Sequence, residues 1–310
     1  MLYTFHPLTK NNLQDVQKLY KLVFGNEYSI NYIIKKYDTS YLIDGYFGHI
    51  AYFNEEPVAF HGAIPILMQY NGVYEIAAQY GDAMTLSTHN GKGLFTKLGQ
   101  LTDIELQKAG IKFVWGFPNQ NSEYGYVNKL DWKFKERIVG FKCKNSIISL
   151  EKISKLNSKI SLVYKKHIEK VFYKYKCGNL LIGSVYKNDN IVSTTRSKDF
   201  YNYKSLNQNF VIEIEKVKFW IKIKNGLLIG DIETPSTHQF YIALNTLKKI
   251  AFQNGLHEIT IQASPNTLIE ELMNETKWKR FDSWIVGYKD FSSSFPLANL
   301  KLTFGDLDTF

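Results

Sequence analysis

An internal repeat is the feature of this sequence that most constrains its fold. Residues 81–120 and 230–267 both begin with Gly-Asp, reach Ser-Thr-His six residues after the glycine, and continue with an amphipathic helical pattern, a glycine and an apolar strand ending near Pro-Asn. The similarity resumes between residues 130–142 (LDWKFKERIVGFK) and 276–289 (TKWKRFDSWIVGYK). Because such self-similarity marks a repeated structural unit, we interpret the chain as two copies of one fold. The length of 310 residues also favours two domains.

Local patterns predict the elements of the first copy. Residues 8–25 have apolar side chains at a helical period and end in a glycine, which predicts an amphipathic helix. Residues 48–86 are rich in aromatic and β-branched side chains and contain Asn71-Gly72, so we expect an antiparallel meander with a type I′ hairpin turn. A second helix is predicted up to Ala109, and a short apolar strand over 111–117.

The stretch STHNGKGLF (87–95) places two glycines where this second helix begins. We expect strands 77–86 and 111–117 to be parallel and adjacent, joined by a right-handed crossover through the helix. The first turn of a helix presents unpaired N–H groups and a partial positive charge to an anion, provided that no Cβ atom intervenes. The loop therefore predicts a pyrophosphate site. Its spacing fits neither a Walker loop nor the dinucleotide-binding fingerprint.

The second copy lacks these glycines. Its equivalent stretch is STHQFYIAL, which puts Phe240 and Tyr241 near the helix start. We expect these side chains to keep a phosphate away from the backbone amides, so that only the first copy binds the ligand.

The order of elements, together with GDAMTLSTHNGKGLFTKL and YVNKLDWKF, resembles the GNAT family of N-acetyltransferases. The family loop Q/R-x-x-G-x-G/A maps onto residues 88–93, with Thr88 in place of the usual Gln or Arg. The resemblance covers about 1–145 and, more faintly, 165–290. It implies an α+β (mixed α/β) fold of two tandem domains, each a mostly antiparallel twisted sheet with a central splayed parallel strand pair flanked by helices. We expect a catalytic domain over 1–148 and a degenerate one over 149–310, the latter preceded by a basic helical linker.

The resemblance also implies acetyl-CoA as co-substrate, with its pyrophosphate on the glycine loop and its pantetheine arm between the splayed strands. The cofactor-binding residues expected from it are Met84, Thr85, Leu86, Thr88, His89, Asn90, Gly91, Lys92, Gly93, Leu94, Phe95, Thr96, Asn119 and Asn121. No metal is expected. An amine would attack the thioester directly, in keeping with the lack of a G-x-S-x-G elbow or of a cysteine near the loop.

Direct attack sets three chemical requirements. A general base must deprotonate the incoming ammonium, and Asp82 is the first candidate, with His61 and His89 as competitors; a structural role, repeated by Asp231, is the alternative for Asp82. The oxyanion needs a donor, for which we expect a backbone N–H around Leu86. The leaving thiolate takes a proton, in the family from a tyrosine. The residue at that tyrosine's position is Val127, which leaves Tyr124 and Tyr126 as the candidate acids.

Charge and cysteine content restrict the partners and the compartment. The formal net charge of +9 suits an anionic partner, and residues 151–176 supply much of it. We interpret this stretch as a solvated helix, with a polyanion site as the alternative. The two cysteines suggest neither a disulfide framework nor a zinc site. The N-terminus shows no secretory pattern and no apolar run reaches about 18 residues, so we expect a cytoplasmic protein without membrane insertion.

The predicted function is acetyl transfer from acetyl-CoA to a primary amine, with an amino sugar or sugar nucleotide of surface polysaccharide synthesis as the acceptor. Two other hypotheses remain open. One is a Fem-like aminoacyl transferase that uses charged tRNA, although no long helical-hairpin arm is present and nucleic acid is not the expected partner. The other is a non-catalytic acyl-CoA-binding module. For the C-terminal residues 297–310, the alternating LKLTF favours a last strand over a docking tail.

Overall fold

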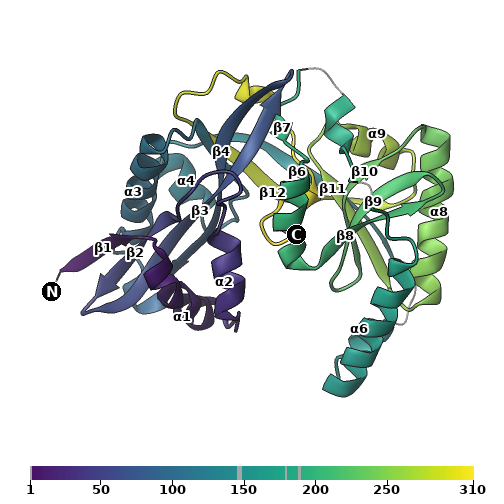
Figure 1. Ribbon diagram of the computed structural model, residues 1–310, viewed down its shortest axis with the longest axis horizontal. Helices are drawn as coiled ribbons and strands as arrows, with labels where there is room; N and C mark the ends of the chain where they lie inside the picture. The colour runs from purple at the N-terminus through teal and green to yellow at the C-terminus, as the bar shows by residue number, and fades with distance from the viewer. Residues whose placement is uncertain (1, 145–148, 179, 188–189) are drawn as a thin grey trace. The chain divides into compact units, whose positions relative to one another are not determined.

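The computed structural model describes residues 2–144, 149–178, 180–187 and 190–310. They form two compact units (Figure 1). Unit 1 consists of Met1–Glu136 and Trp284–Leu300, and unit 2 of Arg137–Ser283 and Lys301–Phe310. This division differs from the expected boundary at 148/149. Unit 2 begins earlier, at Arg137, and unit 1 includes Trp284–Leu300 from the second half of the chain.

Unit 1 has a sheet in the order β1-β2-β3-β4-β5-β12. Its strands and helices are β1 (Tyr3–Pro7), α1 (Leu13–Phe24), α2 (Ile30–Tyr37), β2 (Phe47–Phe53), β3 (Glu56–Tyr70), β4 (Val73–Thr85), α3 (Leu94–Lys108), β5 (Phe113–Gly116), α4 (Glu123–Lys129) and the second half of β12 (Lys279–Asp290). The pair β4–β5 is parallel, and the other pairs with a described register are antiparallel. The predicted parallel crossover through α3 is therefore confirmed.

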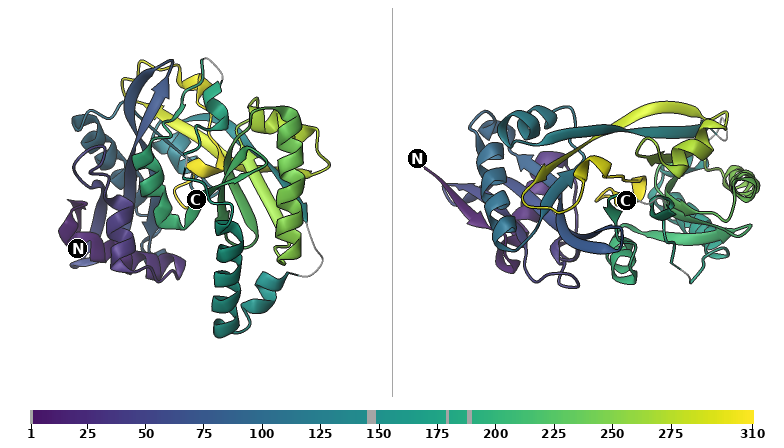
Figure 2. Two further views of the ribbon diagram at one scale, coloured as in Figure 1. Left: turned by 45° about the vertical axis from the view of Figure 1, so that its right-hand side comes forward. Right: turned by 90° about the horizontal axis from the view of Figure 1, so that it is seen from above.

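Unit 2 has a sheet in the order β6-β11-β10-β9-β8. Its elements are most of β6 (Lys133–Lys144), α5 (Leu150–Ser154), α6 (Ser158–Tyr173), β7 (Ser193–Thr194), α7 (Lys198–Lys204), β8 (Asn209–Ile214), β9 (Val217–Ile223), β10 (Leu227–Glu233), α8 (Thr237–Gln253), β11 (Glu258–Ala263) and α9 (Leu268–Asn274). Here the parallel pair is β10–β11, connected by α8, which lies along the sheet (Figure 2, left). The mixed α/β fold thus repeats one antiparallel–parallel–antiparallel arrangement in both units.

The last strand of each repeat belongs to the other unit. β6 follows the first copy in the sequence, but from Arg137 onward it lies in unit 2, where it pairs with β11. β12 follows the second copy, and from Trp284 onward it lies in unit 1, where it pairs with β5. The sequence similarity between residues 130–142 and 276–289 carries no information on which sheet each strand joins.

Turn residues place the elements that matter for the site. Asn71 and Gly72 have φ of 48° and 79° and join β3 to β4, as the hairpin signal predicts. Gly25, at φ 69°, ends α1 in the left-handed conformation. Asp131 has φ 57° two residues after the end of α4, so a non-glycine residue adopts the left-handed conformation there. Strand β1, helix α2 and the exchange of strands were not predicted.

The C-terminal segment is a tail rather than the favoured strand. Among the described residues after β12, the regular pieces are short 3₁₀ turns at Leu297–Asn299 and Phe304–Asp306. Thr303 makes a single bridge to Ala263 at the end of β11. The tail is nevertheless buried, since Leu302, Phe304 and Phe310 are at most 7% exposed.

Candidate active site

The glycine loop ends at the start of α3, where it leaves the backbone accessible. Gly91 and Gly93 both have φ 73°, and a Cβ atom built on either would meet no heavy atom within 4 Å. Gly93 is the N-cap of α3, and no side chain caps the helix. The first N–H bonded within the helix is that of Lys97, to Gly93 O at 3.0 Å. The preceding N–H groups of the first turn therefore have no intrahelical acceptor, and the open glycines allow an anion to reach them.

The polar neighbours of the loop differ in what they can contact. Thr88, Asn90 and Lys92 are exposed beside the glycines. His89 instead packs between Tyr3 and Phe53, and its Nδ1 lies 2.8 Å from the Tyr3 hydroxyl. This contact holds the imidazole against β1 and β2, which argues against His89 as a freely placed base.

The next residues of the helix contribute mainly backbone. Leu94 is buried in a small apolar cluster with Leu98, and the Phe95 ring lies 5.0 Å from that of Tyr126. Thr96 is half-buried. Of these expected ligand-binding residues, Leu94 and Phe95 have side chains that face the protein, so their contact with an anion would come from their N–H groups.

Strands β4 and β5 part beside the loop. Their parallel register runs from Ala78–Val114 to Tyr80–Gly116, where β5 ends. β4 continues to Thr85, paired with β3 on its other side. The edge of β4 between residues 81 and 85 therefore has no β5 partner, as expected for the pantetheine position near Met84, although the Met84 side chain itself is only 2% exposed.

The oxyanion donor is expected among the backbone N–H groups around Leu86. The Leu86 N–H itself donates to Val58 O of β3 at 2.9 Å, so it belongs to the sheet. Because N–H groups of successive strand residues point to opposite edges, the Thr85 N–H faces the edge that β5 has left.

Asp82 lies in a buried polar cluster with residues of α1 and α2. Its carboxylate is 2.6 Å from the Lys36 ammonium and accepts a hydrogen bond from the Tyr37 hydroxyl at 2.5 Å. Lys36 also donates to the Tyr20 hydroxyl at 3.0 Å. Burial alone would raise the pKa of Asp82, but the Lys36 charge and the hydrogen bonds outweigh it and lower the pKa. Such a carboxylate is a weak base with its oxygens already engaged.

His61 and Tyr126 form a buried pair. His61 is 1% exposed, and its Nε2 lies 3.1 Å from the Tyr126 hydroxyl. Burial, with a smaller effect from His49, lowers the pKa of His61 to about 3, so the imidazole is neutral at physiological pH. Within the described part of the chain, His61 Nδ1 is buried without a hydrogen-bond partner. Burial raises the pKa of Tyr126, which therefore stays protonated.

The other candidates on and before α4 are solvent-exposed. Tyr124 is 65% exposed and Val127 is 37% exposed, so neither is brought to His61 as Tyr126 is. Asn119 Oδ1 accepts the N–H groups of Asn121 and Ser122 at 2.9 and 3.0 Å, forming a turn that leads into α4. That turn engages the Asn119 side chain, while the Asn121 side chain is exposed.

The equivalent place in unit 2 is built differently. Gly81 and Gly110 are 29 positions apart and Gly230 and Gly255 are 25 apart, so the second copy is four residues shorter where the first has its loop. The Ser236 side chain caps α8 by accepting the Gln239 N–H at 3.2 Å. Phe240 points into the core, and Tyr241 donates to Leu272 O at 2.9 Å. The missing loop and the Ser236 cap, rather than the expected steric block by Phe240 and Tyr241, distinguish this helix start.

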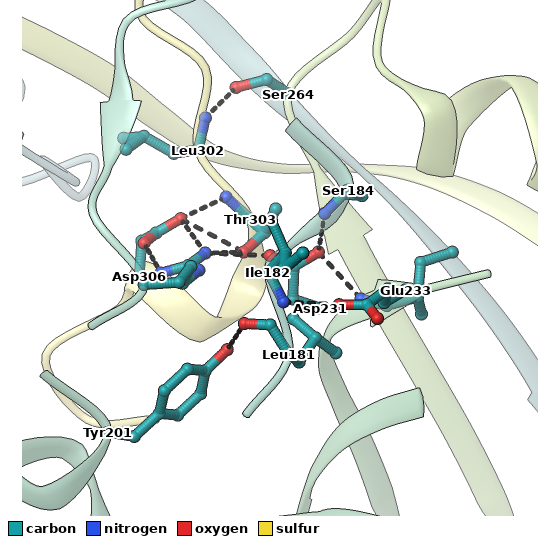
Figure 3. A network of polar contacts seen from close by, with 12 residues as sticks. Leu181, Ile182, Ser184, Tyr201, Asp231, Glu233, Ser264, Leu302, Thr303 and Asp306 are labelled. Atoms are coloured by element: carbon teal, nitrogen blue, oxygen red, sulfur yellow. Dashed lines mark hydrogen bonds and ion pairs between the residues drawn. The ribbon is translucent and has the colours of Figure 1, made fainter. Parts of the chain in front are cut away.

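The chain's own tail occupies the end of β10 and β11. Arg196 binds Asp231, the counterpart of Asp82, at 3.0 Å and Asp306 of the tail at 2.5 Å. Figure 3 shows Asp231 and Asp306 in this polar network, with Thr303 and Leu302 of the tail. The Ser264 N–H donates to Leu302 O at 2.8 Å, and the Leu302 N–H donates to Ser264 Oγ at 2.9 Å. A Cβ on Gly230 would lie 2.5 Å from the Phe310 ring. The ends of the parallel strands of unit 2 are thus covered by the chain's own tail.

A helix that starts at an open glycine loop, beside two parallel strands that part, defines the N-acetyltransferase class of α+β folds. Residues 4–134 match the model of the acetyltransferase (GNAT) domain, so this part of the chain is a GNAT acetyltransferase domain. Proteins of this family use acetyl-CoA as co-substrate. No curated protein matches the chain.

Solved structures share the fold over most of the chain. A GCN5-related N-acetyltransferase from Kribbella flavida matches with 12% identity and a TM-score of 0.61, over 93% of this chain and 71% of that one. One from Anabaena variabilis matches with 12% identity and a TM-score of 0.55, over 92% and 72%. The glucosamine N-acetyltransferase region of a fungal multi-domain GH3 β-N-acetylglucosaminidase matches with 10% identity and a TM-score of 0.53, over 93% and 38%. At these identities the similarity shows the fold, which here extends over both units.

Proposed function

We propose that unit 1 transfers the acetyl group of acetyl-CoA to a primary amine. The observation that carries this proposal is the start of α3: two left-handed glycines with open space at their Cβ positions, next to the free edge of β4. The amides of this helix start, with the side chain of Lys92, would hold the pyrophosphate. Thr88 and Asn90, the remaining polar candidates, are exposed next to the glycines, and in this proposal they also contact the pyrophosphate.

The reaction needs little more than positioning and two donors. The incoming ammonium first loses one proton to solvent, which frees the amine nitrogen for attack. The amine nitrogen attacks the thioester carbonyl, and the Thr85 N–H donates to the oxyanion that forms. When the C–S bond breaks, the thiolate takes the Tyr126 hydroxyl proton and the nitrogen gives up its second proton to solvent. Solvent then returns a proton to the Tyr126 phenolate. The products are an amide and free CoA thiol. In this proposal Asp82 fixes β4 to α2, and Tyr124 has no chemical role.

His61 acts in this proposal as a positioning residue. A neutral imidazole that carries its proton on Nε2, 3.1 Å away, can donate to the Tyr126 hydroxyl oxygen, which holds the phenol in one rotamer and leaves the phenol proton for the thiolate. Neighbouring rings of Tyr80, Phe95 and Trp132 surround the pair and fill the space around it.

The acceptor that we propose is an amino sugar. The support is the fold shared with a glucosamine N-acetyltransferase region, together with the tandem arrangement of the two copies. The test is to mix the protein with acetyl-CoA, record its melting temperature, and then follow thiol release with glucosamine, amino-sugar nucleotides and simple alkylamines. We expect stabilisation by acetyl-CoA and thiol release with amino sugars. Stabilisation without thiol release would favour the non-catalytic module, and no stabilisation would contradict the proposal.

Replacing Tyr126 by phenylalanine is expected to lower kcat about a hundredfold with little change in the KM for acetyl-CoA, because general-acid assistance contributes on the order of 10²–10⁴-fold. The matched control is Tyr124→Phe on the same helix, which should leave kcat within about twofold, since that side chain lies in solvent. His61→Leu should lower kcat by a smaller factor, and His61→Gln, which keeps a hydrogen-bond donor, should restore part of it. Equal kcat in the two tyrosine variants would remove Tyr126 from the mechanism.

Asp82→Asn separates a structural from a catalytic role. The substitution removes the carboxylate partner of the Lys36 ammonium, which is 3% exposed. The lost ion pair should lower the unfolding free energy by on the order of 3 kcal/mol at pH 7. Because the folded-state pKa is lowered below 3.8, this contribution is full above that pH and is lost as the pH falls through the lowered value. Urea unfolding midpoints at pH 7 and pH 3 should therefore differ less in the variant than in the wild type. A variant of unchanged stability that loses the acidic limb of its kcat/KM profile would instead identify Asp82 as the base.

A further inference from the structure

Helices α5 and α6 carry a concentration of exposed apolar side chains. Seven of the large apolar residues with more than a third of their surface exposed lie between positions 150 and 173: Leu150, Ile153, Leu156, Ile160, Leu162, Val163 and Tyr173. Leu156 and Val163 are 87% and 67% exposed. In Figure 1, and in the left view of Figure 2, α6 extends beyond the sheet of unit 2. A soluble surface does not ordinarily gather apolar side chains in this way.

The two faces of α6 are distinct. Ile168 and Phe172 are fully buried in the core of unit 2 and fix the C-terminal half of the helix. On the opposite side, Lys159, Val163, Lys166 and Lys170 follow the spacing i, i+4, i+7, i+11, which places them in one row along the helix. Leu162 and Tyr173 flank this row. We call the lysine row with its flanking apolar side chains the basic–apolar face.

The face is strongly positive. Residues 150–176 contain eight lysines and two glutamates, a surplus of six out of the chain's nine. Lys155 and Lys165 are paired with Glu151 and Glu169. The side-chain ammonium groups of Lys159, Lys166 and Lys170 make no ion pair or hydrogen bond with the part of the protein that the structure describes. Three unpaired ammonium groups therefore lie beside exposed aliphatic side chains.

We propose that the basic–apolar face of α6 binds the surface of an anionic lipid bilayer. Lysines beside exposed aliphatic residues match a surface of lipid phosphates above acyl chains, where the ammonium groups stay at the headgroups and the aliphatic groups enter below them. The helix has 16 residues, about 24 Å, and none of the helices in the described ranges is long and apolar enough to cross a membrane. The helix therefore lies along the surface.

Two other occupants fit the face less well. Nucleic acid would use the lysines but would leave Leu162 and Val163 against phosphates, and the Tyr173 ring of this face is already stacked on Phe210, with the Lys176 ammonium 5.1 Å from its centroid. A second copy of the chain would bring two lysine rows together, and like charges would repel. Of these three occupants, a lipid surface is the one that contacts the lysines and the aliphatic side chains favourably at the same time.

The test is co-sedimentation of the full chain with phosphatidylcholine vesicles and with vesicles of phosphatidylcholine and phosphatidylglycerol in a 1:1 ratio. We expect at least tenfold stronger binding to the anionic vesicles at low salt, weakening as salt is added. The triple variant Lys159→Glu, Lys166→Glu, Lys170→Glu should lose at least tenfold of this binding, and Leu162→Ser with Val163→Ser should also weaken it. The control is the triple variant Lys249→Glu, Lys277→Glu, Lys279→Glu. It makes the same change of charge at three exposed positions, one on α8, one just before β12 and one at the first residue of β12.

Circular dichroism establishes that each variant keeps the wild-type fold before its binding is compared. Equal sedimentation with neutral and anionic vesicles would overturn the proposal, and so would equal loss in the test and control triplets. Salt-sensitive binding of a single-stranded RNA without vesicle binding would assign the face to nucleic acid. None of these measurements depends on acetyl-CoA, so the outcome is independent of the proposed catalysis.

Discussion

Gly93→Glu is expected to abolish acetyl-CoA binding while the protein remains folded. Gly93 caps α3 at φ 73°, in open space, so a glutamate side chain meets no protein atom at its Cβ. Its carboxylate would stand beside the amides that we assign to the pyrophosphate, where it blocks and repels the anion. Gly91→Glu should act in the same way. Isothermal titration with acetyl-CoA should show binding in the wild type and none in either variant.

The control for these variants is Gly110→Glu. Gly110 follows the same helix at its other end, with φ 81° and equally open space. A non-glycine residue in the left-handed region costs about 1–2 kcal/mol at any of the three positions. The three variants should therefore lose similar amounts of stability, and only the two at the loop should lose acetyl-CoA. Intact binding in Gly93→Glu, or lost binding in Gly110→Glu, would show that the start of α3 is not the pyrophosphate site.

Arg196→Met is expected to cause the largest loss of stability, about 3–5 kcal/mol of unfolding free energy. The Arg196 side chain is 1% exposed and pairs with Asp231 and Asp306, whose side chains are 0% and 1% exposed. Methionine would leave two carboxylates buried without their shared cation. Because Asp306 belongs to the tail, the loss should also release the tail from β10 and β11. Denaturant unfolding followed by tryptophan fluorescence reports this, since Trp220 packs on Phe310.

Lys165→Met in the same unit serves as the comparison. Lys165 and Glu169 form a 3.9 Å pair with 53% and 35% of their side chains exposed, and such pairs contribute about 0–1 kcal/mol. A loss in Arg196→Met no larger than that in Lys165→Met would mean that the buried network does not hold the tail.

Local features of the fold were predictable because single residues determine them. Asn71-Gly72 requires a tight turn, Gly25 ends a helix, and the apolar period before Ala109 defines α3. The glycine loop was found in the same way, because only residues without a Cβ combine left-handed φ with an open approach. The parallel pair β4–β5 followed from the rule that a strand–helix–strand crossover joins neighbouring strands.

Features set by distant contacts were not predictable from these patterns. Lys36, the partner of Asp82, lies 46 positions away in the sequence. The signal for this pair is a lysine on the apolar side of α2, and its burial is known only once the helix is packed. Which N–H group around Leu86 faces the free edge of β4 depends on the register with β3, which the sequence pattern does not give. Tyr126 could not be separated from Tyr124 by sequence, since both lie in the same short helix and differ only in which face packs on His61.

The exchange of β6 and β12 determines when each half of the molecule can be completed during synthesis. The strand beside β5 comes from Trp284 onward, so the sheet of unit 1 keeps an open edge until this later segment has been synthesised. A gene fragment that stops near residue 148 would encode the glycine loop in full and still leave that edge uncovered. Neither repeat can therefore be inherited, expressed or lost as an independent module.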